Sequence, residues 1–153
     1  MRTLTLTRTI RVLAPWATAL AVVQDIGNLE YCEPKVDALE LSRESTEGGV
    51  FRASGRLAGL RWSGDFRYRL SADGFDSTEA SPGRSGLNVR GGFHVAPAGE
   101  SASRITHYEQ YMLPPWALPL KRALAWYVGG SMERELENLA RLIAEQLDAA
   151  RAA

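Results

Sequence analysis

The chain has 153 residues and lacks several features that would assign it to a specialised class. Its single cysteine, Cys32, excludes an internal disulfide, which suits a reducing cytosol. Eighteen basic residues balance 18 acidic ones, so no net field of one sign attracts nucleic acid or an anionic membrane. No apolar run approaches the roughly 20 residues of a membrane-spanning helix. We therefore expect a cytoplasmic protein that binds no nucleic acid and is not an integral membrane protein.

Motifs for catalysis and cofactor binding are also missing. The sequence contains no metal-ligand spacing, no phosphate-binding or dinucleotide-binding glycine loop and no serine-nucleophile elbow. We expect neither a bound metal nor a cofactor, and nothing in the sequence indicates the oligomeric state.

The start of the chain allows two interpretations. Arginines at positions 2, 8 and 11 precede an apolar run over residues 12–23, which is the composition of a signal peptide. Residues 3–12 alternate apolar and polar side chains as a strand does, so we favour a segment that belongs to the fold.

The order of the elements is the strongest pattern in the chain. A strand over 3–12 and a short apolar helix over 16–23 precede several strands, with a loop at Ser81-Pro82-Gly83 indicated by its turn residues. A long amphipathic helix follows over about 116–150. Its apolar residues recur every three or four positions and are Leu120, Leu124, Val128, Met132, Leu136, Leu139, Ile143 and Leu147. Because a sheet and a helix bury their apolar faces against each other, we predict one α+β domain over residues 1–153.

Two hairpins permit a prediction of strand register. A tight turn at Ala58-Gly59 pairs Gly55 with Trp62. A three-residue loop before that hairpin pairs Leu41 with Ala53. Both pairings place apolar or small residues on one face, as a half-buried sheet requires.

Five segments carry a resemblance to a known superfamily. They are Ile10-Arg11-Val12-Leu13-Ala14-Pro15, Asp25 about ten residues later, Pro34-Lys35-Val36, Arg104-Ile105-Thr106 and Tyr111-Met112-Leu113-Pro114. Over nearly the whole chain they resemble the START-like (SRPBCC) superfamily, which includes polyketide cyclases, coenzyme Q-binding proteins and the birch pollen allergen. The resemblance implies a helix-grip fold, in which a curved antiparallel sheet wraps around a long C-terminal helix and encloses a hydrophobic cavity. It does not imply catalysis, since many members only bind or carry.

His107 and Glu109 are the candidate catalytic residues. They lie two positions apart on the last predicted strand, so their side chains leave the same face. A histidine beside a carboxylate in an apolar cavity can move a proton as a general acid or base. We favour the alternative, a hydrogen-bonded pair that orients a ligand.

Arg8 is a candidate ligand-binding residue because it interrupts the apolar face of the first strand. A buried arginine needs a partner, and Glu109 is suitable if the two strands are neighbours. The guanidinium would then hold a ligand carbonyl or carboxylate. The alternative is that Arg8 reaches water at the strand end.

The remaining candidate residues are expected to line the cavity. Aromatic residues at strand spacing, a glycine that faces inward by parity and two residues of the helix stripe form this group, namely Trp62, Tyr68, Gly91, Phe93, Tyr111, Val128 and Met132. The pair Gly129-Gly130 interrupts the helix, which indicates either a close approach of the sheet or a ligand, or a local kink.

These observations favour a protein that binds a hydrophobic small molecule such as a lipid, a quinone or a polyketide. Two alternatives stay open. One is an enzyme of the aromatase/cyclase type that uses His107 or Glu109 for proton transfer. The other is an accessory protein that docks through an outward arginine stripe, defined as Arg52, Arg56, Arg61, Arg67 and Arg69.

Overall fold

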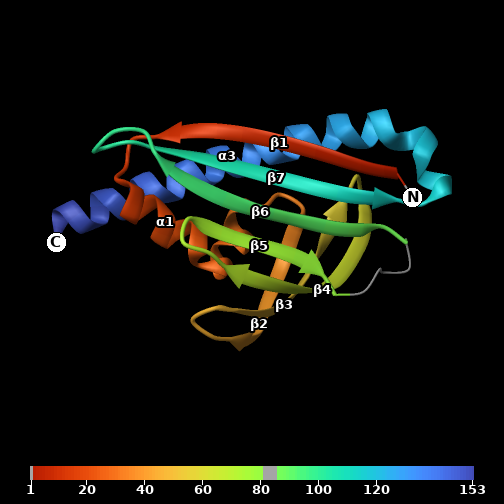
Figure 1. Ribbon diagram of the computed structural model, residues 1–153, viewed down its shortest axis with the longest axis horizontal. Coiled ribbons are helices and arrows are strands. Elements are labelled where there is room, and N and C mark those ends of the chain that lie inside the picture. The colour runs from red at the N-terminus through yellow and green to blue at the C-terminus, as the bar shows by residue number, and fades with distance from the viewer. Residues whose placement is uncertain (1, 81–85) are drawn as a thin grey trace.

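The computed structural model describes residues 2–80 and 86–153, in which seven strands form one sheet (Figure 1). The strands are β1 Arg2–Val12, β2 Val36–Glu44, β3 Gly48–Leu57, β4 Leu60–Leu70, β5 Gly74–Glu79, β6 Asn88–Pro97 and β7 Ser103–Leu113. Their order across the sheet is β1-β7-β6-β5-β4-β3-β2, with antiparallel neighbours throughout. The loop predicted at Ser81-Pro82-Gly83 lies outside the described residues.

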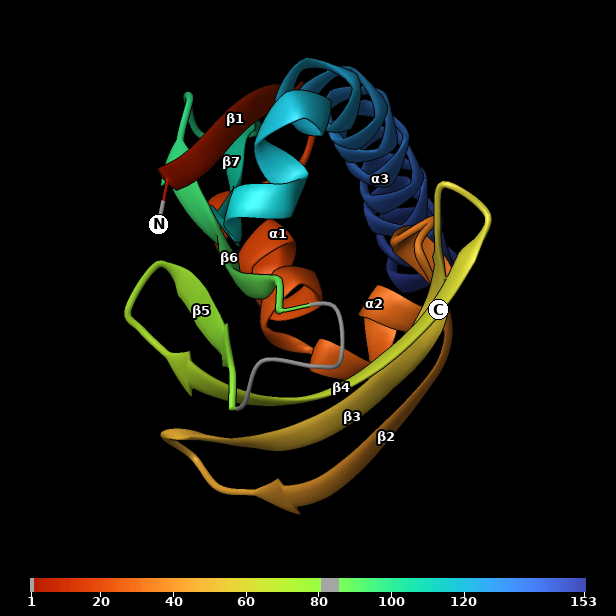
Figure 2. The ribbon, with the colours of Figure 1, turned by 90° about the vertical axis from the view of Figure 1, so that its right-hand side faces the viewer.

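Helices fill and close the curve of this sheet. They are α1 Trp16–Gln24, the 3-10 turn η1 Ile26–Asn28, α2 Leu29–Cys32, the 3-10 turn η2 Pro115–Leu120 and α3 Lys121–Ala152. Figure 2 shows the sheet curling from β1 to β2 around α1 and α2, with α3 along the side that the sheet leaves open. This is the predicted α+β helix-grip architecture.

The long helix begins later than its apolar pattern suggests. Proline lacks a backbone N–H, and Pro115 and Pro119 both fall in the first stretch, so the chain forms the 3-10 turn η2 before regular α-helix begins at Lys121. Along α3 the stripe is buried from Val128 to Ile143, whereas Leu120 remains 56% exposed.

The register of the β3–β4 hairpin is as predicted. Gly55 pairs with Trp62, and the turn residues Ala58 and Gly59 have φ values of 49° and 82°. Two positive φ values are typical of the tight turns whose twist matches that of the flanking strands.

The predicted pairing of Leu41 with Ala53 is wrong by two positions. Leu41 pairs with Phe51, and Ala53 pairs with Leu39. The shift is even, so the faces of both strands are preserved. Its physical origin is a β-bulge beyond Leu41 together with a turn in which the Ser45 N–H donates to the Gly48 carbonyl at 2.8 Å.

Arg8 forms an ion pair between β1 and α3. The prediction that its partner is Glu109 is wrong, because the partner is Glu133. The Arg8 Nε atom lies 3.3 Å from Glu133 Oε1 on α3, and the Arg8 side chain is 37% exposed. A Cβ atom on Gly129 would lie only 2.7 Å from the Arg8 guanidinium. Because β1 is an edge strand beside α3, the guanidinium extends to the helix surface and not along the face of the sheet toward Glu109 on β7. The glycine therefore marks a close approach of the sheet.

Substitutions at Gly55 and Gly130 test how closely neighbouring atoms pack against each of these glycines. A Cβ on Gly55 would lie 1.8 Å from the Lys35 carbonyl oxygen, whereas a Cβ on Gly130 meets no atom within 4 Å. We expect Gly55→Ala to lower the free energy of unfolding by about 3 kcal/mol or more. Gly130→Ala should raise it by up to about 1 kcal/mol, the difference in helix propensity. Chemical denaturation measures both, and a Gly55→Ala variant as stable as the parent would contradict the close approach of β2 and β3.

Candidate functional site

A cavity of about 630 Å³ lies between the sheet and the helices, a volume typical of small-molecule sites. Most of its wall is apolar and comes from Leu29, Val36, Phe51, Ala53, Leu57, Trp62, Phe66, Phe75, Leu87, Val89 and Phe93. Arg61 and Ser63 on the wall are exposed, so they mark its mouth. Six polar side chains on the wall are at most 9% exposed and mark its inner end, namely Glu33, Lys35, His107, Glu109, Tyr111 and Glu135.

The structure brings most of the predicted site residues to this cavity. Those on its wall are Trp62, Gly91, Phe93, His107, Glu109 and Tyr111. Tyr68 instead packs against Phe51, with ring centroids 6.0 Å apart, and Arg8 lies on the surface of α3. Val128 and Met132 pack with Leu4 and Leu113 in a core cluster between α3 and the β1–β7 pair. Four predicted site residues, Arg8, Tyr68, Val128 and Met132, therefore do not line the cavity.

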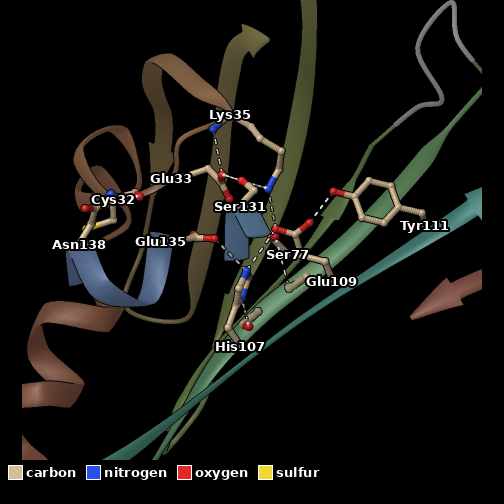
Figure 3. Close-up of polar contacts among 12 residues, drawn as sticks. Cys32, Glu33, Lys35, Ser77, His107, Glu109, Tyr111, Ser131, Glu135 and Asn138 are labelled. Carbon is tan, nitrogen blue, oxygen red and sulfur yellow. Dashed lines mark hydrogen bonds and ion pairs between the residues drawn. The ribbon is translucent and has the colours of Figure 1, made fainter. Parts of the chain in front are cut away.

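A buried polar cluster occupies the inner end of the cavity (Figure 3). It consists of seven residues from three parts of the chain, which are Glu33, Lys35, His107, Glu109, Tyr111, Ser131 and Glu135. Each is at most 9% exposed. Glu33 and Lys35 flank Pro34 between α2 and β2. His107, Glu109 and Tyr111 alternate along β7, and Ser131 and Glu135 lie one turn apart on α3. We call this set the inner cluster.

Glu109 is the most highly connected member of the inner cluster. Its Oε1 atom accepts hydrogen bonds from Lys35 Nζ at 3.0 Å and from His107 Nε2 at 3.2 Å. Its Oε2 atom accepts a hydrogen bond from the Tyr111 hydroxyl. Burial by itself would raise the pKa of Glu109, but the Lys35 ammonium and the His107 ring hold that pKa well below its usual range. Glu109 is therefore a carboxylate.

Lys35 supplies the first cation of the inner cluster. Its Nζ atom lies 3.0 Å from Glu33 Oε1, 3.0 Å from Glu109 Oε1 and 3.2 Å from Ser131 Oγ. Burial lowers the pKa of Lys35, but the Glu109 carboxylate and the contact with the Glu33 carboxyl group outweigh it and raise the pKa above its ordinary value. Lys35 is consequently an ammonium and not a free amine nucleophile.

His107 supplies the second cation. Its Nδ1 atom donates to the Gly92 carbonyl at 2.8 Å, and its Nε2 atom lies 3.0 Å from Glu135 Oε2 as well as 3.2 Å from Glu109 Oε1. Both ring nitrogens thus face acceptors, which requires a proton on each. Burial lowers the pKa of His107, but Glu135 and Glu109 raise it overall to well above its ordinary value. The imidazolium stacks on Phe93 with centroids 4.0 Å apart.

One carboxyl oxygen of Glu33 and one of Glu135 lie within 4.8 Å of each other, so each group affects the protonation of the other. Burial and the charge of Glu135 raise the pKa of Glu33 well above its ordinary value. Burial also acts to raise the pKa of Glu135, but the His107 imidazolium lowers it. With the proton on Glu33, two cations balance two carboxylates and the inner cluster is neutral.

Four members of the inner cluster are the described residues best placed to hold a metal ion. One donor atom each from Glu33, His107, Glu109 and Glu135 lies within 4.8 Å of the others. The Lys35 ammonium already contacts two of these carboxyl groups, and the proton on His107 Nε2 occupies the lone pair that a metal needs. A metal ion would have to displace the Lys35 ammonium and the proton on His107 Nε2.

Sequence reasoning missed four members of the inner cluster. Glu135 had a signal, because it lies three residues after Met132 and four before Leu139 on the buried stripe of α3. Ser131 follows Val128 by three positions on the same stripe. Glu33 and Lys35 had none, since charged residues that flank a proline are usually exposed.

The arginine stripe is exposed along its whole length. Arg52 pairs with Asp65 at 3.1 Å, and Arg56 lies opposite Arg61 on the neighbouring strand as the register predicts. Arg61 also reaches the mouth of the cavity.

The comparisons with known proteins agree with this architecture. Residues 3–144 match the family model for polyketide cyclase/dehydrase and lipid transport, and the chain belongs to that family. Structural neighbours include the ZhuI aromatase/cyclase from Streptomyces sp. R1128, with 13% identity, a TM-score of 0.84 and coverage of 97% of this chain and 98% of that one.

Two further neighbours have different descriptions. A START superfamily protein from Mycobacterium smegmatis is 16% identical, with a TM-score of 0.75 and coverage of 94% and 98%. Norcoclaurine synthase from Thalictrum flavum, in complex with dopamine and hydroxybenzaldehyde, is 15% identical, with a TM-score of 0.70 and coverage of 94% and 88%. At such identities the likeness shows the fold alone. No curated protein matches the chain in sequence.

Among the described residues, none of the helices combines the length and the apolar character needed to cross a membrane.

The protonation of His107 leads to a prediction about pH. His107 should keep both ring protons at pH 7.5, whereas an unperturbed imidazole has largely lost one. A raised folded-state pKa contributes stability that is complete below the unfolded value, about 6.5, and is lost as pH rises through the folded value. NMR of the ring nitrogens and denaturation between pH 6 and 9 should show a protonated ring and falling stability. A His107 that titrates near pH 6.5 would contradict the assignment.

Proposed function

We propose that the protein binds a hydrophobic small molecule, such as a lipid, a quinone or a polyketide, in the cavity between the sheet and α3. The observation that carries this proposal is a cavity of about 630 Å³ with an apolar wall and a polar inner end. Such a site holds an apolar body and fixes one polar group of the ligand. Membership of a family described by polyketide cyclase/dehydrase and lipid transport supports it.

The apolar wall is large enough to contribute to ligand affinity. Burial of about 300 Å² of apolar ligand surface contributes roughly 7 kcal/mol before the cost of association. A cost of about 4 kcal/mol leaves about 3 kcal/mol, an affinity in the millimolar range for a ligand that uses apolar contacts alone.

A substitution on β6 tests this use of the cavity. Val89 lines the cavity, whereas its neighbour Arg90 is exposed. Val89→Trp should fill the cavity and weaken binding of the neutral dye N-phenyl-1-naphthylamine by about tenfold or more, equivalent to about 1.4 kcal/mol. Arg90→Trp is the matched control and should leave binding unchanged. Position 91 is less suitable because a Cβ on Gly91 would lie 3.1 Å from the Tyr108 carbonyl oxygen.

Fluorescence titration of the dye measures both variants, and near-identical circular dichroism spectra establish that both are folded. Equal dye binding by the parent and a folded Val89→Trp variant would show that the dye does not bind in this cavity.

A second candidate function is acid–base catalysis of the aromatase/cyclase type. The observation that favours it is Glu33, a carboxyl on the cavity wall whose pKa burial and Glu135 raise. A protonated carboxyl at neutral pH can act as a general acid. His107 and Glu109 are less suited to the proton transfer proposed from sequence, because the imidazolium has no free lone pair and Glu109 accepts three hydrogen bonds. Docking through the arginine stripe has no supporting contact among the described residues.

Exchange of the central proton of a β-diketone tests this candidate. Proton donation from Glu33 to a carbonyl oxygen of benzoylacetone would assist water in removing the central proton. Benzoylacetone in deuterated buffer should therefore exchange faster with the protein than with buffer, and Glu33→Gln should lower that acceleration by about 100-fold. Glu79→Gln, on the same wall but outside the inner cluster, is the control. Proton NMR follows the exchange, and an acceleration that survives in Glu33→Gln would leave Glu33 without a catalytic role.

A further inference from the structure

Apart from the Glu33 carboxyl, the side-chain hydrogen-bond donors at the inner end of the cavity are committed to protein acceptors. The three Lys35 N–H groups are directed to Glu33, Glu109 and Ser131. The remaining side-chain donors pair as His107 Nδ1 with Gly92 O, His107 Nε2 with Glu109, Tyr111 Oη with Glu109, Ser131 Oγ with Glu33, Trp62 Nε1 with Lys35 O, and Ser77 Oγ with Gly91 O. The Glu33 carboxyl lies next to Glu135, with one oxygen of each within 4.8 Å of the other. Apart from Glu33, the inner-end side chains named here thus offer a ligand no N–H or O–H that is free of a protein acceptor.

Two acceptors at the inner end, the Tyr111 oxygen and Glu109 Oε2, can accept further hydrogen bonds. The Tyr111 oxygen donates its one proton to Glu109 Oε2 and keeps its lone pairs, and Glu109 Oε2 receives only that one hydrogen bond in the described part of the chain. Both residues line the cavity. The Tyr111–Glu109 pair thus presents oxygen lone pairs without protons to a ligand.

We propose that the inner cluster selects apolar ligands that end in a neutral hydroxyl group, which donates to the Tyr111–Glu109 pair. This inference rests on the proposed ligand-binding function and specifies its ligand class. A ketone or an ether would place its own lone pairs against those of Tyr111 and Glu109, leaving buried acceptors unpaired at a cost of about 1–3 kcal/mol. An ammonium ligand would add charge to a set in which Lys35 and His107 already balance two carboxylates.

The ligand polarity can be measured with three compounds that share one ring system. 2-Naphthol carries a hydroxyl donor, whereas 2-methoxynaphthalene and 2-acetylnaphthalene carry acceptors alone. Each competes with N-phenyl-1-naphthylamine for the cavity. We expect 2-naphthol to bind about tenfold more tightly than either of the others, because a site that hydrogen-bonds one group discriminates against analogues lacking it.

Glu109→Gln tests which groups set this preference. The amide oxygen must occupy the place of Oε1, where it accepts from Lys35 and His107, so the amide NH₂ faces Tyr111. The NH₂ then donates to the Tyr111 oxygen and turns the tyrosine proton toward the cavity. The preference for 2-naphthol should disappear or reverse toward 2-acetylnaphthalene. Arg61→Gln, which removes the cation at the cavity mouth, should leave the preference of the parent protein unchanged.

The outcomes separate this inference from the function on which it rests. If the dye does not bind the parent protein, the proposed function fails. If the dye binds and the three compounds compete equally, or an acceptor compound competes best, the function stands and the hydroxyl selection is wrong. A preference that is lost in Arg61→Gln would assign recognition to the mouth and overturn the role of the inner cluster. The measurements on the parent protein decide the question even if Glu109→Gln does not fold.

Discussion

Four ionised side chains, Lys35, His107, Glu109 and Glu135, lie at the inner end of the cavity, and removing each from water costs several kcal/mol unless partners compensate. The compensation comes from three parts of the chain at once. Lys35 arrives from the segment before β2, His107 and Tyr111 from β7, and Glu135 from α3. The curved sheet and the helix must therefore meet in one arrangement for the charges to balance, which makes this contact a constraint on the whole fold.

The same constraint shapes the cavity and what it can bind. Apolar residues of β3, β4 and β6 form the walls, and because the inner cluster uses its own donors, the polar end is rich in acceptors. The family includes proteins described by cyclase activity and by lipid transport, and the fold alone does not choose between them. The protonation of Glu33 and the direction of the Tyr111 proton are the details that decide which chemistry this chain can perform.

Local patterns made the fold predictable, and distant contacts limited the prediction of the site. Alternation gave β7 and placed His107, Glu109 and Tyr111 on one face, and the turn at Ala58-Gly59 set the β3–β4 register. The burial of Glu33 and Lys35 depends on residues about 70 to 100 positions away, so no local pattern indicates it. Arg8 was misassigned for a related reason, because parity gives the face of a strand but not whether a helix lies beyond it.

The coupling between Lys35 and Glu109 is the most direct measure of the central claim that charge balance constrains the fold, because Lys35 precedes β2 and Glu109 lies on β7, on opposite sides of the curved sheet. A double-mutant cycle compares Lys35→Met, Glu109→Gln and the double variant by chemical denaturation. Lys35→Met alone should lower the free energy of unfolding by about 3–5 kcal/mol, because it leaves buried carboxylates without their cation. The double variant should be more stable than additivity requires by about 1.5 kcal/mol or more. Additive effects within about 0.5 kcal/mol would contradict the claim.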